Sequence, residues 1–66
     1  MKLYREGTLL RDNHGHLWVI TGYCKNEGFP SDLPNAYSLV CLKDGFYRNP
    51  LFEMIKVGFE VLSESE

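Results

Sequence analysis

The segment 7–23, GTLLRDNHGHLWVITGY, most constrains the fold, because it reads as two short strands joined by a tight turn. Its turn, residues 12–15 (DNHG), consists of residues that tolerate the left-handed backbone of hairpin loops. The second strand is rich in β-branched and aromatic residues and alternates as a half-buried strand does. We expect the only tryptophan, Trp18, to lie in the core with Ile20. The opposite face would then carry Leu17, Val19, Thr21 and Tyr23.

A second hairpin is predicted by Asp44-Gly45, between a strand at 36–42 and a return strand at 46–48. In the first of these strands, Tyr37, Leu39 and Cys41 would share one face, and Ser38, Val40 and Leu42 the other. Between the hairpins, residues 24–35 contain Gly28, Pro30 and Pro34, which predicts an exposed loop. Residues 59–62 read as a closing strand.

Residues 51–57 fit two structures. Asn49 as N-cap, Pro50 at the first helical position and Gly58 after the end predict a two-turn helix. Alternation of apolar and charged residues predicts a strand instead. We favour a strand or a single helical turn.

These elements predict one all-β domain spanning residues 1–66, with about five short strands and one helical turn near 50–57. A chain this short buries only about 60% of its unfolded surface. Closing the strands into a small antiparallel barrel would protect the strand edges. Leu3 and Tyr4 are expected to close over the core.

The first hairpin resembles the opening of SH3-like small barrels of the Tudor and KOW kinds. The residues that carry the resemblance are Gly7, Asp12, Gly15, Trp18, Gly22 and Tyr23. It implies a fold more than an activity, because small barrels host many functions. The compact size and the lack of a catalytic motif also resemble accessory proteins of bacteriophages.

Charge argues against nucleic-acid binding, because the net charge is −2 and no basic stripe is present to match a phosphate backbone. The negative excess lies in the second half, at Glu60, Glu64 and Glu66. No apolar run approaches the roughly 20 residues of a membrane span. The N-terminus has no signal-peptide pattern, so we expect a cytoplasmic protein.

Catalytic and metal chemistry find little support. His14, His16, Cys24 and Cys41 are zinc-ligand types, but they lack paired C-x-x-C spacing. We interpret both cysteines as packing residues, since free cysteine behaves as a small hydrophobe. We predict no enzymatic activity, no metal and no cofactor.

The aromatic residues suggest a binding role, because one tryptophan, four tyrosines and four phenylalanines cannot all be interior in so small a barrel. We therefore expect a non-enzymatic module that binds another protein through the 24–35 loop and flanking aromatics, and that modulates or inhibits a host protein. The predicted binding residues are Tyr23, Lys25, Phe29, Leu33, Tyr37, Tyr47 and Arg48. The alternatives are a binder of single-stranded RNA or DNA, in which the tyrosines stack bases, and a homo-oligomer paired through a strand edge.

Overall fold

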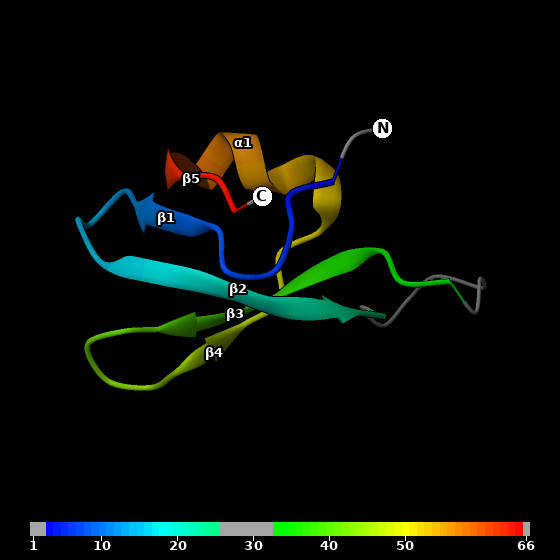
Figure 1. Cartoon of the computed structure of the whole chain (residues 1–66), viewed down its shortest axis with the longest axis horizontal. Helices are drawn as coiled ribbons and strands as arrows, with labels where there is room; N and C mark the ends of the chain where they lie inside the picture. The colour runs from blue at the N-terminus through cyan, green and yellow to red at the C-terminus, as the bar shows by residue number, and fades with distance from the viewer. Residues whose placement is uncertain (1–2, 26–32, 66) are drawn as a thin grey trace.

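The computed structural model describes residues 3–25 and 33–65, and these contain a five-stranded antiparallel sheet with one short helical segment (Figure 1). The strand order is β4-β3-β2-β1-β5. The prediction of a mostly-β domain of about five strands is confirmed. The strands are β1 (Leu9–Asp12), β2 (Leu17–Cys24), β3 (Ala36–Cys41), β4 (Tyr47–Arg48) and β5 (Phe59–Ser63), and the helical segment is η1 (Phe52–Met54) followed by α1 (Ile55–Gly58).

The turn of the first hairpin is organised by the carboxylate of Asp12. One oxygen, Oδ1, accepts hydrogen bonds from the backbone N–H groups of His14 and His16, each at 2.9 Å. The other, Oδ2, accepts the indole N–H of Trp18 at 2.9 Å. Gly15 closes the turn with φ +81°, a conformation that glycine adopts without steric cost. Trp18 is only 5% exposed, so its predicted place in the core is confirmed.

A β-bulge in β2 changes which face its last residues occupy. The pairing of β2 with β3 shifts register between Ile20 and Gly22, so that Thr21 is an extra residue. Because side chains alternate along a strand, one extra residue moves all later side chains to the opposite face. Tyr23 consequently pairs with Tyr37 and shares the core face with it. The prediction that Tyr23 shares a face with Leu17 and Val19 is wrong.

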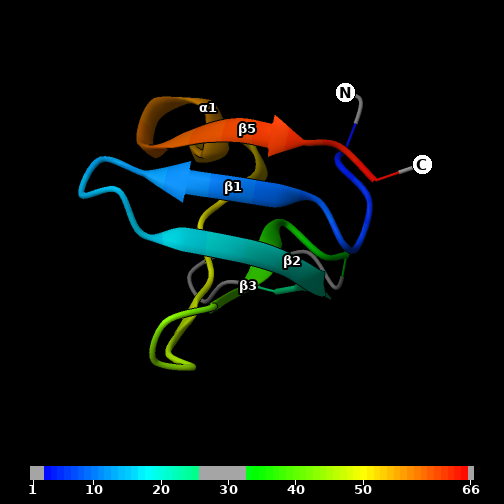
Figure 2. The ribbon, with the colours of Figure 1, turned by 60° about the vertical axis from the view of Figure 1, so that its left-hand side comes forward.

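The core lies on the concave face of a strongly curled sheet. Figure 2 shows β5, β1 and β2 side by side, with β3 turning away behind them. The two edge strands, β4 and β5, approach each other across the core. Arg48 of β4 places its guanidinium carbon 5.1 Å from the ring centroid of Phe59 in β5 and 5.6 Å from that of Trp18. The buried core cluster consists of Leu10, Trp18, Ile20, Tyr37, Leu39, Cys41 and Ile55.

The helical segment covers residues 52–58, so the helical alternative for this region is correct and the strand that was also favoured is wrong. It packs beside β5 and buries Ile55 in the core (Figure 1). The predicted cap is wrong, because Leu51 occupies the N-cap position and no side chain caps the helix. Asn49 instead accepts a hydrogen bond from the thiol of Cys24, with 3.5 Å between Sγ and Oδ1.

Pairing of β1 with β5 joins distant parts of the chain. Arg11 and Glu60 face each other across these strands and form an ion pair of 2.6 Å. The backbone N–H of Ser65 donates to the hydroxyl of Thr8, which is fully buried. Leu3 and Tyr4 pack against the core as predicted.

Candidate functional site

Tyr37 was predicted to belong to an exposed binding patch, but it lies in the core. It is 1% exposed, and its ring packs edge-on against Phe52 at a centroid distance of 4.9 Å. Its hydroxyl accepts a hydrogen bond from the backbone N–H of Tyr4 at 3.0 Å. Burial raises the pKa of this phenol above its ordinary value. A side chain enclosed in this way has no surface to offer a partner.

Tyr23 is partly exposed, at 38%, yet it is tied into the same aromatic cluster. Its ring lies 5.8 Å from that of Tyr37 and 5.9 Å from that of Phe52. Its hydroxyl donates to the carbonyl oxygen of Tyr4 at 2.6 Å. Tyr23 thus anchors the residues before β1 to the sheet, and only its outer edge is accessible.

The remaining predicted site residues are divided between different surfaces. Tyr47 is 74% exposed and pairs with Val40, so it lies on the convex face, away from the core. Arg48, next to it, lies on the concave side over Trp18. Lys25 is exposed and Leu33 is 72% exposed. Phe29 lies outside the described residues, as does most of the predicted 24–35 loop. The described members do not form a single patch.

The convex face carries an apolar surface, of which only Tyr47 was predicted to be a binding residue. Cross-strand pairing aligns Leu9, Val19, Val40 and Tyr47 in a row over β1, β2, β3 and β4. With strands about 4.8 Å apart, the row spans about 14 Å. Leu17 and Leu42 lie beside it, nearer the turns, where Leu42 N–H donates to the Leu17 carbonyl at 3.0 Å. We call these residues the outer face: Leu9, Leu17, Val19, Val40, Leu42 and Tyr47.

The outer face is open to solvent at several points. Leu17 is 38% exposed, Leu42 57% and Tyr47 74%, whereas Leu9, Val19 and Val40 are half-buried by their neighbours. The helical segment packs on the other side of the sheet, against the core. An antiparallel sheet with one solvated face normally has polar residues there. Apolar residues on both faces of β2 and β3 were the signal in the sequence that could have identified this surface.

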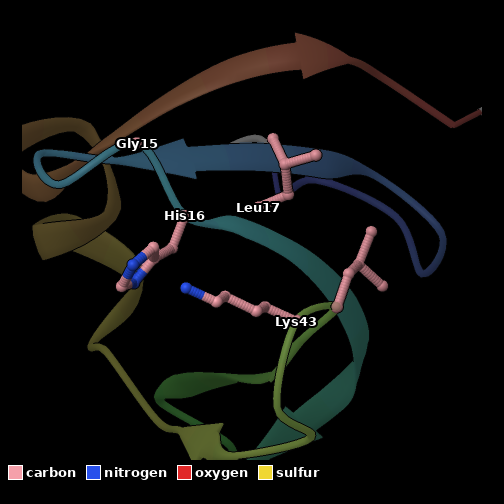
Figure 3. A pocket seen from close by; sticks show the side chains of 5 residues that line it. Gly15, His16, Leu17 and Lys43 are labelled. Atoms are coloured by element: carbon pink, nitrogen blue, oxygen red, sulfur yellow. The ribbon is translucent and has the colours of Figure 1, made fainter.

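A shallow depression of about 320 Å³ lies at the turn end of the outer face, lined by Gly15, His16, Leu17, Leu42 and Lys43 (Figure 3). It separates the turn of the first hairpin from the turn between β3 and β4. Figure 3 shows the Lys43 side chain extending toward the imidazole of His16, with Leu17 on the other side of the depression. The depression therefore combines an aliphatic wall with two nitrogen-bearing side chains.

The carboxylates near this depression are committed to other partners. Asp12 has a side chain only 6% exposed. Partial burial opposes its ionisation, but the hydrogen bonds from the Trp18 indole and the His16 and His14 backbone outweigh burial and lower the pKa of Asp12 to about 2. Asp44 accepts the backbone N–H of Phe46 at 3.1 Å, and this bond lowers the pKa of Asp44.

No group of three His, Cys, Asp or Glu side chains within residues 3–25 and 33–65 is arranged to hold a metal ion. Cys41 is a buried core residue and Cys24 is half-buried, both as free thiols, so Cys41 has the packing role expected of it. No helix in the described part of the chain is long and apolar enough to cross a membrane.

This chain was compared with protein families, curated proteins and solved structures. No protein family, no curated protein and no solved structure matches it.

Proposed function

We propose that this chain is a non-enzymatic protein-binding module that docks its partner through the outer face. The observation that carries the proposal is the apolar row across four strands, flanked by Leu17 and Leu42 and ending at the exposed Tyr47. Contiguous exposed apolar surface on a small protein commonly marks an interaction site. The partner is a protein that presents a complementary apolar stripe.

Tyr47 and Leu42 are the residues on which we expect affinity to depend most. Both are more than half exposed, so they lose the most contact with water when a partner covers them. Tyrosine is frequent among interface residues whose truncation costs about 2 kcal/mol or more. Val19 and Val40 are already half-buried and supply a flat base for the contact.

A single-stranded nucleic acid fits this surface less well. Base stacking needs several exposed aromatic rings along a basic groove. The described tyrosines do not provide such a platform, because Tyr37 is buried and Tyr23 and Tyr47 lie on opposite faces. Arg11, beside Leu17 on the outer face, is paired with Glu60, and Lys43 at the depression is a single basic side chain rather than a basic groove.

The proposal is tested by capturing proteins from the source cells with the immobilised chain, and then measuring the direct binding of each purified candidate. Tyr47→Asp and Leu42→Asp place a charge on the outer face and should each weaken binding at least tenfold. Val57→Asp is the matched control, because Val57 is also 74% exposed but lies in α1, on the other side of the sheet. Fluorescence of Trp18 verifies that all variants remain folded.

Two results would contradict the proposal. One is a direct partner that binds Tyr47→Asp, Leu42→Asp and the unmodified chain equally well. The other is binding that nuclease treatment abolishes, which would favour the nucleic-acid alternative. Sedimentation at several concentrations addresses the homo-oligomer alternative, and a dimer that Tyr47→Asp disrupts would identify a second copy as the occupant of the outer face.

A further inference from the structure

The exposed charge at the depression has the opposite sign to the net charge of the chain. The net charge is −2, yet the groups facing the depression are the ammonium of Lys43 and the imidazole of His16. No ion pair joins Lys43 to a carboxylate of the described chain. His16 has one ring nitrogen, Nδ1, at 3.8 Å from Asp12 Oδ2, a longer contact than a hydrogen bond. An incoming anion would therefore meet an ammonium group that no carboxylate of residues 3–25 and 33–65 pairs.

Neither of the two nearby carboxylates, Asp12 and Asp44, forms an ion pair with Lys43. Asp12 is almost completely covered, and its two oxygens accept bonds from the backbone and from the Trp18 indole. Asp44 is exposed beside Lys43 and interacts electrostatically with His16, but one of its oxygens accepts the Phe46 N–H and it forms no ion pair with Lys43. The ammonium of Lys43 therefore remains available to an external anion.

The spacing of the apolar residues defines what would accompany that anion. Lys43 follows Leu42, and His16 precedes Leu17, so charge and aliphatic wall are adjacent. Val19 lies two residues beyond Leu17, and Val40 two residues from Leu42, so each valine is about 7 Å from its leucine along the strand direction. Two residues is also the repeat at which side chains of an extended chain return to the same side. An extended segment lying along β2 would place a carboxylate over Lys43 and His16 and aliphatic side chains over Leu17 and Val19.

We propose that the partner presents an extended acidic segment, in which an Asp or Glu is followed at two-residue intervals by aliphatic residues. This inference rests on the proposed function, because it names the kind of segment that occupies the outer face. It assigns the carboxylate to Lys43 and His16, and the aliphatic residues to Leu17, Leu42 and the apolar row.

The test is selection of displayed random 12-residue peptides on the immobilised full chain. Peptides selected on the unmodified chain should be enriched in Asp or Glu two residues from a Leu, Ile or Val. Selection on Lys43→Glu should replace the acidic residue with Lys or Arg at that position. Lys56→Glu is the matched control, since it makes the same charge change on the exposed surface of α1, and its selected peptides should stay acidic.

One selected peptide is then measured by fluorescence anisotropy against each variant. Lys43→Glu should weaken its binding about 5- to 10-fold at low salt, and Lys56→Glu less than 2-fold. Added salt should reduce the difference between the two variants.

The results separate this inference from the proposed function. Peptides that lose affinity on Tyr47→Asp but carry no acidic residue, or that are insensitive to Lys43→Glu, would overturn the acidic segment and leave the outer face in place. Peptides that are insensitive to Tyr47→Asp and Leu42→Asp, or a failure to select any, would overturn both. Selected basic peptides would also refute the inference.

Discussion

Replacement of Tyr37 tests whether this residue is structural, as the fold requires, or a binding residue, as the sequence suggested. Tyr37→Phe removes the hydroxyl that accepts the Tyr4 N–H at 3.0 Å and leaves the ring contacts in place. Loss of one such hydrogen bond lowers the free energy of unfolding by about 1 kcal/mol. Tyr37→Ala also removes the ring that packs on Phe52 and Tyr23, which should cost about 3–5 kcal/mol.

The size of the chain makes these losses easy to detect. At about 0.05–0.15 kcal/mol per residue, its total stability is about 3–10 kcal/mol. In urea, where small proteins lose about 1 kcal/mol per molar denaturant, Tyr37→Phe should lower the midpoint by about 1 M. Tyr37→Ala should lower the midpoint by about 3–5 M, so that the variant is largely unfolded even without urea if the total stability lies in the lower half of this range. Fluorescence of Trp18, which is buried in the same core, reports the transition.

Tyr47→Ala is the control for Tyr37→Ala, because it removes the same side chain from a position that is 74% exposed. We expect it to change the free energy of unfolding by no more than about 0.5 kcal/mol. Equal urea midpoints for Tyr37→Ala and Tyr47→Ala would refute the assignment of Tyr37 to the core. A Tyr37→Ala protein that stays fully folded but loses its partner would restore the surface role.

Three further changes test the turns and the curl of the sheet. The pKa of Asp12 is lowered from 3.8 to about 2, so its stabilising effect is complete above pH 4 and is lost as the pH falls toward 2. Between pH 4 and pH 2 the urea midpoint should fall less in Asp12→Asn than in the unmodified chain. The same fall in both proteins would contradict the stabilising hydrogen bonds to the Asp12 carboxylate. Gly7→Ala should lower the free energy of unfolding by about 1–3 kcal/mol, because φ is +91° and the new Cβ would lie 3.3 Å from Ser65 Oγ. Thermal unfolding measures this loss, and an unchanged melting temperature would refute the strain. Arg48→Gln should destabilise the protein by about 0.5–1 kcal/mol and shift Trp18 fluorescence, because it removes the cation over the indole; an emission spectrum identical to that of the unmodified chain would contradict this contact.

Local signals predicted the hairpins and the core of this protein well. The DNHG turn, the Asp44-Gly45 turn and the burial of Trp18 all depend on residues close together in sequence, where backbone preference and alternation decide the structure. The prediction of which β3 side chains share a face was also correct, and Tyr37, Leu39 and Cys41 are all buried. The resemblance to SH3-like barrels stays a prediction.

The errors arose where a long-range contact decides the outcome. Thr21 gives no local indication of a bulge, and the register shift exists only in the pairing of β2 with β3. That shift brought Tyr23 to the core face beside Tyr37, so that a partly exposed ring and a fully buried ring belong to one aromatic cluster. The helical segment at 52–58 was ambiguous because its apolar residues fit both periods, and the placement of Ile55 in the core decides between them. The depression combines the turns of two hairpins, so no single stretch of sequence encodes it.

The pairing of β1 with β5 has a consequence for how the chain acquires its structure. Arg11 and Glu60 are neighbours in space although 49 positions separate them. The first hairpin therefore emerges during synthesis long before the strand that covers its outer edge. Until β5 is made, β1 keeps an unpaired edge, and topologies with such high contact order fold slowly. A nascent chain halted after α1 would expose that edge to other chains, and aggregation of the arrested product would be its most direct sign.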